Sequence, residues 1–345
     1  MPINSSWINL TDNCNISCEW CYVKGSTSNK VMETTKAFQI LDWLQEINCG
    51  KCVLIGGEPT IHPKLPSIIK YGEDRGIPMH LVSNGRRFAN ENFCDQVISS
   101  GLSINRLTFS MYACSPESSK KLTGSAIYFR EFETGFKNMS KKGIIPNITI
   151  TVSRPILEYA EAMIRWSRDA GVKNIILNMG VPTVSQNKID GSFTLSPNKL
   201  GEESVRLYKL AVDCNLNVKV FLRVPFCVLS KDDIMLLQAD NAIQVGCHVQ
   251  AGSGIVFTVK GEITTCNHLL DFPVYSEHVT REIGVTGQLS YVWENTPLIS
   301  ISESARAFRS ANCQNCKYYG ICTGGCPIVW SFYDPQEYIT GWVPK

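Results

Sequence analysis

The segment Cys14-Asn15-Ile16-Ser17-Cys18-Glu19-Trp20-Cys21 places three cysteines within eight residues, directly after an apolar stretch at residues 7–10. Thiolates are soft ligands that suit iron–sulfur clusters or zinc. A four-iron cluster normally takes four cysteines, so these three would leave one iron open to a substrate. A zinc site would need a fourth ligand, and the nearest other cysteines, Cys49 and Cys52, lie beyond an expected helix. A zinc site and a redox C-x2-C pair are the alternatives to a cluster.

Apolar segments of strand length recur outward from this motif, at residues 7–10, 53–55, 80–83, 106–110, 147–152 and 174–178. Stretches with helical periodicity lie between most of them, at residues 34–47, 65–75, 91–100, 129–142 and 156–170. This alternation predicts an α/β fold with a parallel sheet and right-handed crossovers. Six units fall short of the eight of a closed barrel, so we expect a partial (β/α)6 TIM-like barrel with its active site at the carboxyl ends of the strands.

The later part of the chain differs in character. A polar stretch at residues 182–196 breaks the pattern, and Ser196-Pro197 opens a helix that we expect to run to about Cys214. Beyond it come short strands at residues 218–223 and 254–259, many turns and seven of the fifteen cysteines. We therefore expect a barrel with a bridging helix at residues 1–214 and a small cysteine-rich α+β domain at residues 215–345.

Composition narrows the class of protein. The 345 residues carry a formal net charge of +2, which argues against a protein that coats nucleic acid. The apolar fraction of 44% suits a packed core, no apolar run is long enough for a membrane span, and no signal peptide is visible. We therefore expect a cytoplasmic protein with no membrane partner, in which fifteen cysteines are not a disulfide framework.

The first cysteine motif, C-x3-C-x-aromatic-C, resembles that of the radical S-adenosylmethionine (radical SAM) superfamily. Ile55-Gly56-Gly57-Glu58-Pro59 looks like the family's GGEP segment, whose backbone receives the methionine amino group of SAM. Ser83-Asn84-Gly85 and Ser153-Arg154 match positions that contact the ribose and carboxylate, although each alone also fits an ordinary strand-to-loop turn. The resemblance covers residues 5–180. It implies a [4Fe–4S] cluster on Cys14, Cys18 and Cys21, and SAM contacts from Gly56, Gly57, Glu58, Pro59, Ser83, Asn84, Ser153 and Arg154.

The implied chemistry is the family's. An electron, from a donor such as a flavodoxin or ferredoxin, cleaves SAM to a 5′-deoxyadenosyl radical that abstracts a substrate hydrogen. The cofactor carries this chemistry, while the barrel supplies orientation and excludes water. Gly57 is expected to let SAM approach the backbone, so that Gly57→Val would fold yet bind SAM poorly.

The C-terminal cysteines look like the SPASM extension of such enzymes. Cys247 precedes Gly261-x4-Cys266, and a C-x2-C-x5-C-x3-C run follows from Cys313 to Cys326. The resemblance implies one auxiliary cluster on Cys247, Cys266 and Cys326 and a second on Cys313, Cys316 and Cys322. A zinc knuckle is the alternative for the C-terminal run.

No cysteine follows Cys326, so the second cluster lacks its usual last ligand, and a smaller single-cluster "twitch" arrangement stays open. Asp334 is a candidate oxygen ligand, although a solvated loop carboxylate is the preferred reading. Cys227 could complete a cluster, act as a catalytic thiol or be buried, and burial is preferred because free cysteine is often core. No role is assigned to the remaining cysteines, Cys49, Cys52, Cys94, Cys114 and Cys214.

SPASM enzymes mostly modify ribosomally made peptides or proteins by crosslinking, epimerisation or side-chain oxidation, and we expect a peptide maturase of this kind. The cluster motif begins at Cys14, which leaves no preceding domain for a leader peptide, so a separate recognition protein or direct binding is expected. A dehydrogenase or mutase acting on a small molecule is the alternative. A non-catalytic iron–sulfur or zinc scaffold is the alternative of another class.

Overall fold

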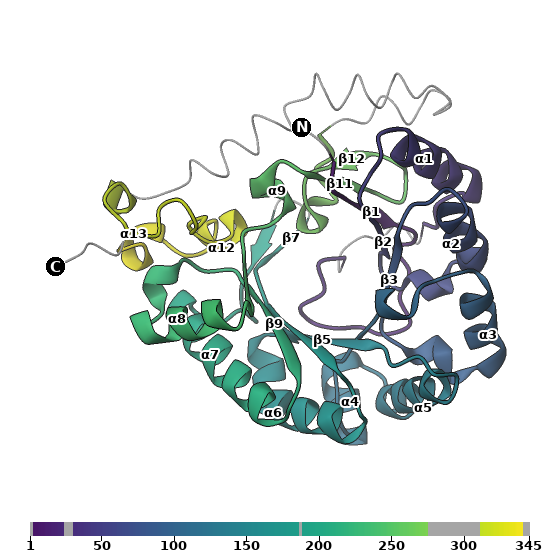
Figure 1. The fold of residues 1–345 in the computed structure, drawn as a ribbon, viewed down its shortest axis with the longest axis horizontal. Coiled ribbons are helices and arrows are strands. Elements are labelled where there is room, and N and C mark those ends of the chain that lie inside the picture. The colour runs from purple at the N-terminus through teal and green to yellow at the C-terminus, as the bar shows by residue number, and fades with distance from the viewer. Residues whose placement is uncertain (1–2, 24–29, 186–187, 275–310, 341–345) are drawn as a thin grey trace.

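The computed structural model describes residues 3–23, 30–185, 188–274 and 311–340. Six parallel strands pair in the order of the sequence: β1 (Ser5–Asn9), β2 (Cys52–Ile55), β3 (Met79–Ser83), β4 (Leu107–Ser110), β5 (Asn147–Val152) and β6 (Asn174–Met179). The helices that connect them lie on the outer face of the curved sheet (Figure 1). They are α1 (Thr34–Glu46), α2 (Leu65–Glu73), α3 (Glu91–Ser99), α4 (Pro116–Thr123), α5 (Tyr128–Lys141) and α6 (Arg154–Asp169). The expected α/β fold with a partial barrel is confirmed.

Burial explains why these segments take these forms. Every residue of β2 is buried, as expected for a parallel strand that is covered on both faces. Helix α5 buries one stripe, which includes Phe132 and Phe136, and both rings pack against Trp166 of α6. Apolar residues at helical spacing therefore hold the outer layer on the sheet.

The sheet continues beyond the six expected units. β9 (Asn217–Leu222) pairs in parallel with β6, and β10 (Ile243–Val245) pairs with β9. At the other end β11 (Gly254–Phe257) pairs in parallel with β1, and β12 (Ile263–Thr264) pairs with β11 in antiparallel fashion. Among the described residues the order is β10-β9-β6-β5-β4-β3-β2-β1-β11-β12, with β10 and β12 as the two ends.

The boundary that we expected near residue 215 therefore does not fall at an edge of the sheet. The strands expected within a separate C-terminal domain, now β9 and β11, belong to the sheet of the barrel because they continue its hydrogen-bonding on both sides. Helix α7 (Pro197–Asp213), between β6 and β9, begins after Ser196 as expected, with the Ser196 side chain accepting from the Lys199 N–H. The division of the chain into two domains stays a prediction.

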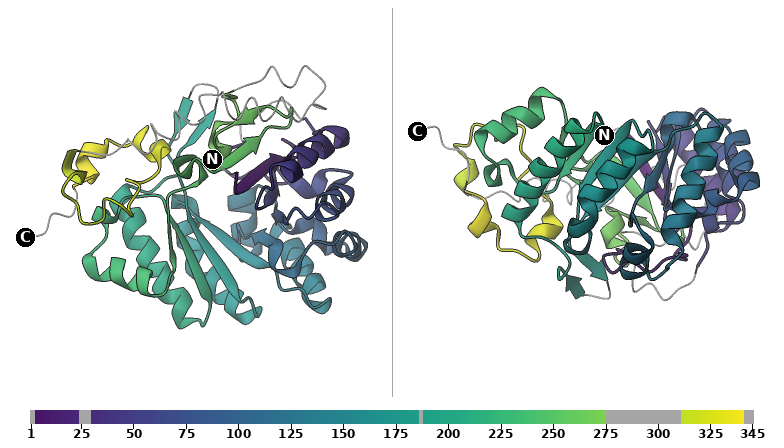
Figure 2. Two further views of the ribbon diagram at one scale, coloured as in Figure 1. Left: turned by 45° about the horizontal axis from the view of Figure 1, so that its top comes forward. Right: turned by 90° about the horizontal axis from the view of Figure 1, so that it is seen from below.

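The remaining elements are short. β7 (Thr183–Ser185) and β8 (Lys188–Asp190) form a hairpin, and α8 (Lys231–Ala239) and α9 (His248–Ala251) flank β10. The last helices, α12 (Pro327–Trp330) and α13 (Pro335–Tyr338), lie beside α8 at one end of the sheet (Figures 1 and 2). Ile328, Val329 and Trp330 of α12 form a small apolar cluster with Val181 and Ile339, and Tyr338 of α13 packs against it. No helix of the described residues is both long and apolar enough to cross a membrane.

Candidate active site at the carboxyl edge of the barrel

The loop that carries the first three cysteines follows β1 and is fixed by main-chain hydrogen bonds. The Gly57 N–H donates to the Thr11 carbonyl at 2.6 Å, and the Glu58 N–H donates to the Asn13 carbonyl at 2.8 Å. A Cβ added at Gly57 would lie 2.3 Å from the Asn13 carbonyl oxygen and 2.7 Å from that of Asp12. Glycine at this position therefore lets the cysteine loop approach the end of β2.

The motif itself is anchored on the barrel. Trp20 is buried and its ring lies 6.1 Å from that of Tyr112, just after β4. The Ser17 N–H donates to the Thr123 carbonyl at the end of α4 at 2.8 Å. Cys18 is buried and Cys14 is exposed as a residue, yet burial around the Cys14 thiol, with a smaller contribution from Glu58, raises its pKa to about 12.

A second loop, after β3, reaches the cysteine loop. The Asn84 amide donates to the Asn15 side-chain oxygen at 2.7 Å and lies 4.0 Å from the Cys14 sulfur. The Arg86 guanidinium donates to the Asn15 carbonyl and also contacts the Glu131 carboxylate at 2.5 Å. The structure therefore places Asn84, a predicted site residue, directly beside the first cysteine of the motif.

Glu58 joins the loops after β2 and β3. Its buried carboxylate accepts from the Thr60 hydroxyl at 2.6 Å, the Ser83 hydroxyl at 2.8 Å and the Asn84 N–H at 2.7 Å. Burial raises the pKa of this carboxyl group, and these donors partly offset that effect. Protein groups thus occupy the Glu58 carboxylate and the Ser83 hydroxyl, so both side chains help to position Asn84.

The two predicted SAM contacts after β5, Ser153 and Arg154, differ from Glu58 and Ser83 in their hydrogen bonding. The Ser153 hydroxyl oxygen is buried and has no hydrogen-bond partner among the described residues. Arg154 donates from its N–H to the Phe193 carbonyl at 2.8 Å and from its guanidinium to the Thr194 carbonyl at 3.1 Å. Buried hydroxyls are nearly always hydrogen-bonded, so the unsatisfied oxygen of Ser153 fits a position that a ligand would complete. Pro59 is buried at the start of the 3-10 turn Pro59–Ile61.

The sequence of this region matches one family model, that of the radical SAM superfamily, over residues 8–157. Residues 8–157 are a radical SAM domain. All the predicted SAM contacts and the first three cysteines lie inside the matched range. The cofactors of the domain are S-adenosylmethionine and a [4Fe–4S] cluster.

Curated relatives extend beyond the radical SAM domain. The AdoMet-dependent heme synthase of Methanosarcina barkeri is 23% identical over 328 residues, which covers 91% of this chain and 88% of that protein. The probable GTP 3′,8-cyclase of Saccharolobus solfataricus is 27% identical over 179 residues, 51% of this chain and 56% of that protein.

Two solved structures share the fold along most of the chain. Streptococcus suis SuiB bound to S-adenosylmethionine has a TM-score of 0.70 at 16% identity, and covers 97% of this chain and 76% of SuiB. The enzyme anSMEcpe with bound AdoMet has a TM-score of 0.68 at 16% identity, and covers 94% of this chain and 89% of that enzyme. At these identities the likeness concerns the fold.

C-terminal to the radical SAM domain, three of the predicted ligands come together. Burial, with smaller contributions from the nearby thiols of Cys326 and Cys247, raises the pKa of the Cys266 thiol to about 12. The Arg223 guanidinium has the opposite effect on Cys266 and Cys326, and the Cys326 N–H donates to the Arg223 carbonyl at 2.8 Å. The structure thus gathers Cys247, Cys266 and Cys326 in one place, next to a cationic side chain.

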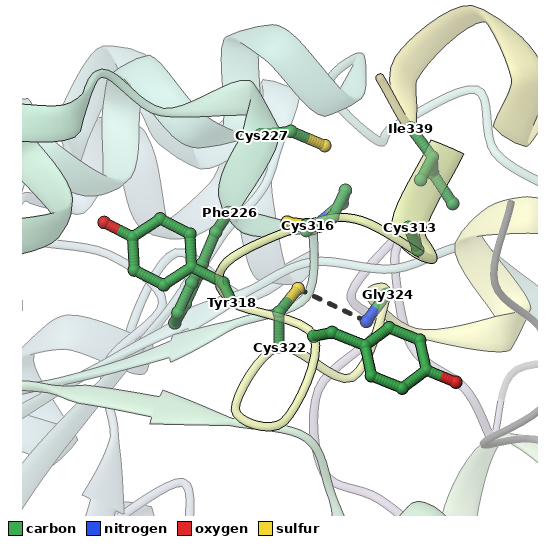
Figure 3. A pocket seen from close by; sticks show the side chains of 10 residues that line it. Phe226, Cys227, Cys313, Cys316, Tyr318, Cys322, Gly324 and Ile339 are labelled. Atoms are coloured by element: carbon green, nitrogen blue, oxygen red, sulfur yellow. Dashed lines mark hydrogen bonds between the residues drawn. The ribbon is translucent and has the colours of Figure 1, made fainter. Parts of the chain in front are cut away.

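The other three predicted ligands, Cys313, Cys316 and Cys322, line a single cavity that is partly open to solvent (Figure 3). Cys227 lines the same cavity and is half-buried, whereas burial was the preferred prediction from the sequence. Asp334 is exposed, and its carboxylate caps α13 by accepting from the Gln336 N–H at 2.9 Å. Across the described part of the chain, no three Cys, His, Asp or Glu side chains are arranged to hold a single metal ion.

Sequence reasoning missed four residues that shape these sites. Asn15 and Arg86 link the cysteine loop to β3, Thr60 holds Glu58, and Arg223 lies beside Cys266 and Cys326. Asn15 and Thr60 stand inside or next to a recognised motif, which is the signal that could have drawn attention to them. Arg86 and Arg223 have no such signal, because the fold alone brings them to their partners.

Proposed function

We propose that this radical SAM enzyme carries a SPASM-type C-terminal segment and modifies a ribosomally made peptide or protein. The observation that supports this proposal is the presence of two separate groups of three cysteines, both C-terminal to the radical SAM domain. One group is Cys247, Cys266 and Cys326, and the other is Cys313, Cys316 and Cys322, which line one cavity. The reaction would be a crosslink, an epimerisation or the oxidation of a side chain. We propose a cytoplasmic location for a protein with this function.

The residues of the barrel fit the cofactors. Cys14, Cys18 and Cys21 would hold the cluster, and Gly56 to Pro59, Ser83, Asn84, Ser153 and Arg154 would form the SAM site. When bound, these cofactors supply a 5′-deoxyadenosyl radical that takes a hydrogen atom from the substrate. Asn84 would orient the ligand beside Cys14, and Glu58 would keep Asn84 in place through its N–H. The unsatisfied hydroxyl of Ser153 would donate to an acceptor of SAM.

The C-terminal thiols would hold auxiliary clusters. Thiolates are the usual ligands of iron–sulfur clusters, and three of them at Cys247, Cys266 and Cys326 would leave one iron open. Arg223 would compensate part of the negative charge of that cluster. An external donor such as a flavodoxin or ferredoxin would supply electrons.

A second candidate is a reaction on a small molecule, and one observation favours it. The relatives named as heme synthases align with 91% and 92% of this chain, far more than the region of the radical SAM domain. A precursor of heme is therefore the small molecule to test first. Two solved structures favour a peptide, since SuiB is described as bound to the precursor peptide SuiA and anSMEcpe as bound to the Kp18Cys peptide.

The two candidates differ in what stimulates SAM cleavage. The reconstituted, dithionite-reduced enzyme should form 5′-deoxyadenosine in either case, whereas a non-catalytic scaffold would form none. Co-expression with short open reading frames from the neighbourhood of its gene, with or without a small peptide-binding partner, should yield a peptide of altered mass or stereochemistry. Stimulation of turnover by a heme precursor, with every peptide unchanged, would decide for the small-molecule reaction.

A further inference from the structure

No cysteine stands among residues 327–345, and the fold places a fourth thiol, that of Cys227, at the cavity lined by Cys313, Cys316 and Cys322. Cys313, Cys316 and Cys322 come from the C-terminal run, while Cys227 comes from the turn after β9, at least 86 residues earlier in the chain. Figure 3 shows the sulfur atoms of Cys227, Cys316 and Cys322 turned toward the same space. We propose that Cys227 is the fourth thiolate ligand of the second auxiliary cluster, an inference that rests on the proposed function.

The local structure holds Cys227 in this position. Pro225 precedes the 3-10 turn Phe226–Val228, and the Leu229 N–H closes the turn on the Phe226 carbonyl at 2.9 Å. The fully buried Phe226 ring packs edge-on against Tyr318, with the ring centroids 5.4 Å apart. Tyr318 lies between Cys316 and Cys322, so this contact ties the turn that carries Cys227 to the loop that carries the other ligands.

The surroundings of the cavity favour a thiolate over an oxygen atom as the fourth ligand of a cluster. Four of the ten residues that line the cavity are cysteines, and thiolates are the usual ligands of iron–sulfur clusters. The Gly324 N–H donates to the Cys322 sulfur at 3.4 Å, and hydrogen bonds of this kind accompany cluster thiolates. Asp334, the acidic candidate from the sequence, does not line the cavity and is committed to the cap of α13.

Ligation changes one contact of Cys227 and releases one proton. In the structure the Cys227 sulfur lies 3.4 Å from the Tyr338 carbonyl, to which the thiol donates. On ligation the sulfur–iron bond forms, the S–H bond breaks and the proton passes to solvent. With four thiolates every iron of this cluster is bound by protein, which suits electron transfer and not the binding of a substrate.

The test uses the full chain in which Cys14, Cys18 and Cys21 are replaced by Ala, so that the iron measured belongs to the C-terminal clusters. In this parent we expect about eight irons per chain after anaerobic reconstitution. Adding Cys227→Ala should remove about one to four of these irons and change the electron paramagnetic resonance (EPR) spectrum of the reduced protein. Adding Cys227→Ser, which keeps a possible oxygen ligand and the shape of the turn, should retain more iron but shift the spectrum.

Two variants serve as matched controls. Cys214→Ala removes a buried thiol at the end of α7, and Asp334→Ala removes the acidic candidate, so both should keep the iron content and spectrum of the parent. Parent-like iron and spectra for both Cys227 variants would overturn the inference while leaving the auxiliary clusters in place. A loss of iron in Asp334→Ala alone would overturn it in favour of an oxygen ligand. A parent that holds zinc or no metal would instead refute the auxiliary clusters of the proposed function.

Discussion

Replacing Gly57 by Ala tests how the end of β2 supports the cysteine loop. The new Cβ would lie 2.3 Å from the Asn13 carbonyl oxygen and 2.6 Å from its carbon, and both are main-chain atoms that cannot rotate away. Relief of this overlap requires the loop to move by about 1 Å, because favourable contacts begin near 3.5 Å. Such a shift also weakens the 2.6 Å bond from the Gly57 N–H to the Thr11 carbonyl.

We expect the free energy of unfolding to fall by about 2–4 kcal/mol, from overpacking of about 1–3 kcal/mol and about 1 kcal/mol for the weakened hydrogen bond. Urea unfolding gives this value, and the iron content with the rate of 5′-deoxyadenosine formation reports the fate of the cluster site. The loop displacement should lower both. This differs from the simple block of SAM binding expected from the sequence for Gly57→Val, because the added atoms meet protein before they meet any ligand.

The matched control is Gly171→Asn. Gly171 has a φ of +80° and no atom within 4 Å of an added Cβ. The chain itself places Asn48, Asn215 and Asn241 at positive φ, so Asn should be tolerated there. A Gly57→Ala protein with the stability and SAM cleavage of the Gly171→Asn control would refute the reasoning.

Three further predictions follow from named contacts. Glu58→Gln puts an NH₂ group against the N–H of Asn84 or the hydroxyl of Ser83, and should lower the free energy of unfolding, measured in urea, by about 1–3 kcal/mol. The control Glu117→Gln changes an exposed carboxylate and should leave the free energy of unfolding nearly unchanged. Burial, reinforced by Lys51 and Arg106, lowers the pKa of His80 from 6.5 to about 4, so folded His80 stays neutral where the unfolded chain binds a proton. Stability should therefore fall as the pH drops from about 6.5 toward 4, and His80→Gln should show a shallower fall in melting temperature, while an unchanged pH slope would contradict this assignment. Trp20→Ala should lower the free energy of unfolding, measured in urea, by about 3–5 kcal/mol because the ring is buried against the barrel. Wild-type stability in this variant would show that the ring does not anchor the loop.

Local patterns in the sequence predicted the barrel strands closely. The expected strands at residues 147–152 and 174–178 correspond to β5 and β6, because alternation of apolar residues and neighbouring turns are local properties. The pairing of β1 with β11 joins residues such as Ser5 and Gly254, and no local pattern indicates a register over that separation. The sequence therefore predicted the strand near residue 254 but not its pairing with β1.

The candidate site likewise has one part that the sequence predicted and another part that depends on the fold. Spacing identified the cysteines, since ligands of one cluster often lie close together in the chain. The contact of Asn84 with Asn15 spans 69 residues, and the cavity joins Cys227 to a run that begins at Cys313. Both depend on contacts between segments that lie far apart in the sequence, which become visible only in the folded chain.

The most direct test of the central claim is the formation of 5′-deoxyadenosine by the full chain after anaerobic reconstitution, with dithionite and S-adenosylmethionine. We predict that the wild-type protein forms 5′-deoxyadenosine and that the variant with Cys14, Cys18 and Cys21 replaced by Ala forms none while still binding iron in its C-terminal part. Equal amounts of 5′-deoxyadenosine from both proteins, or none from the wild-type protein with its iron complement intact, would contradict the account.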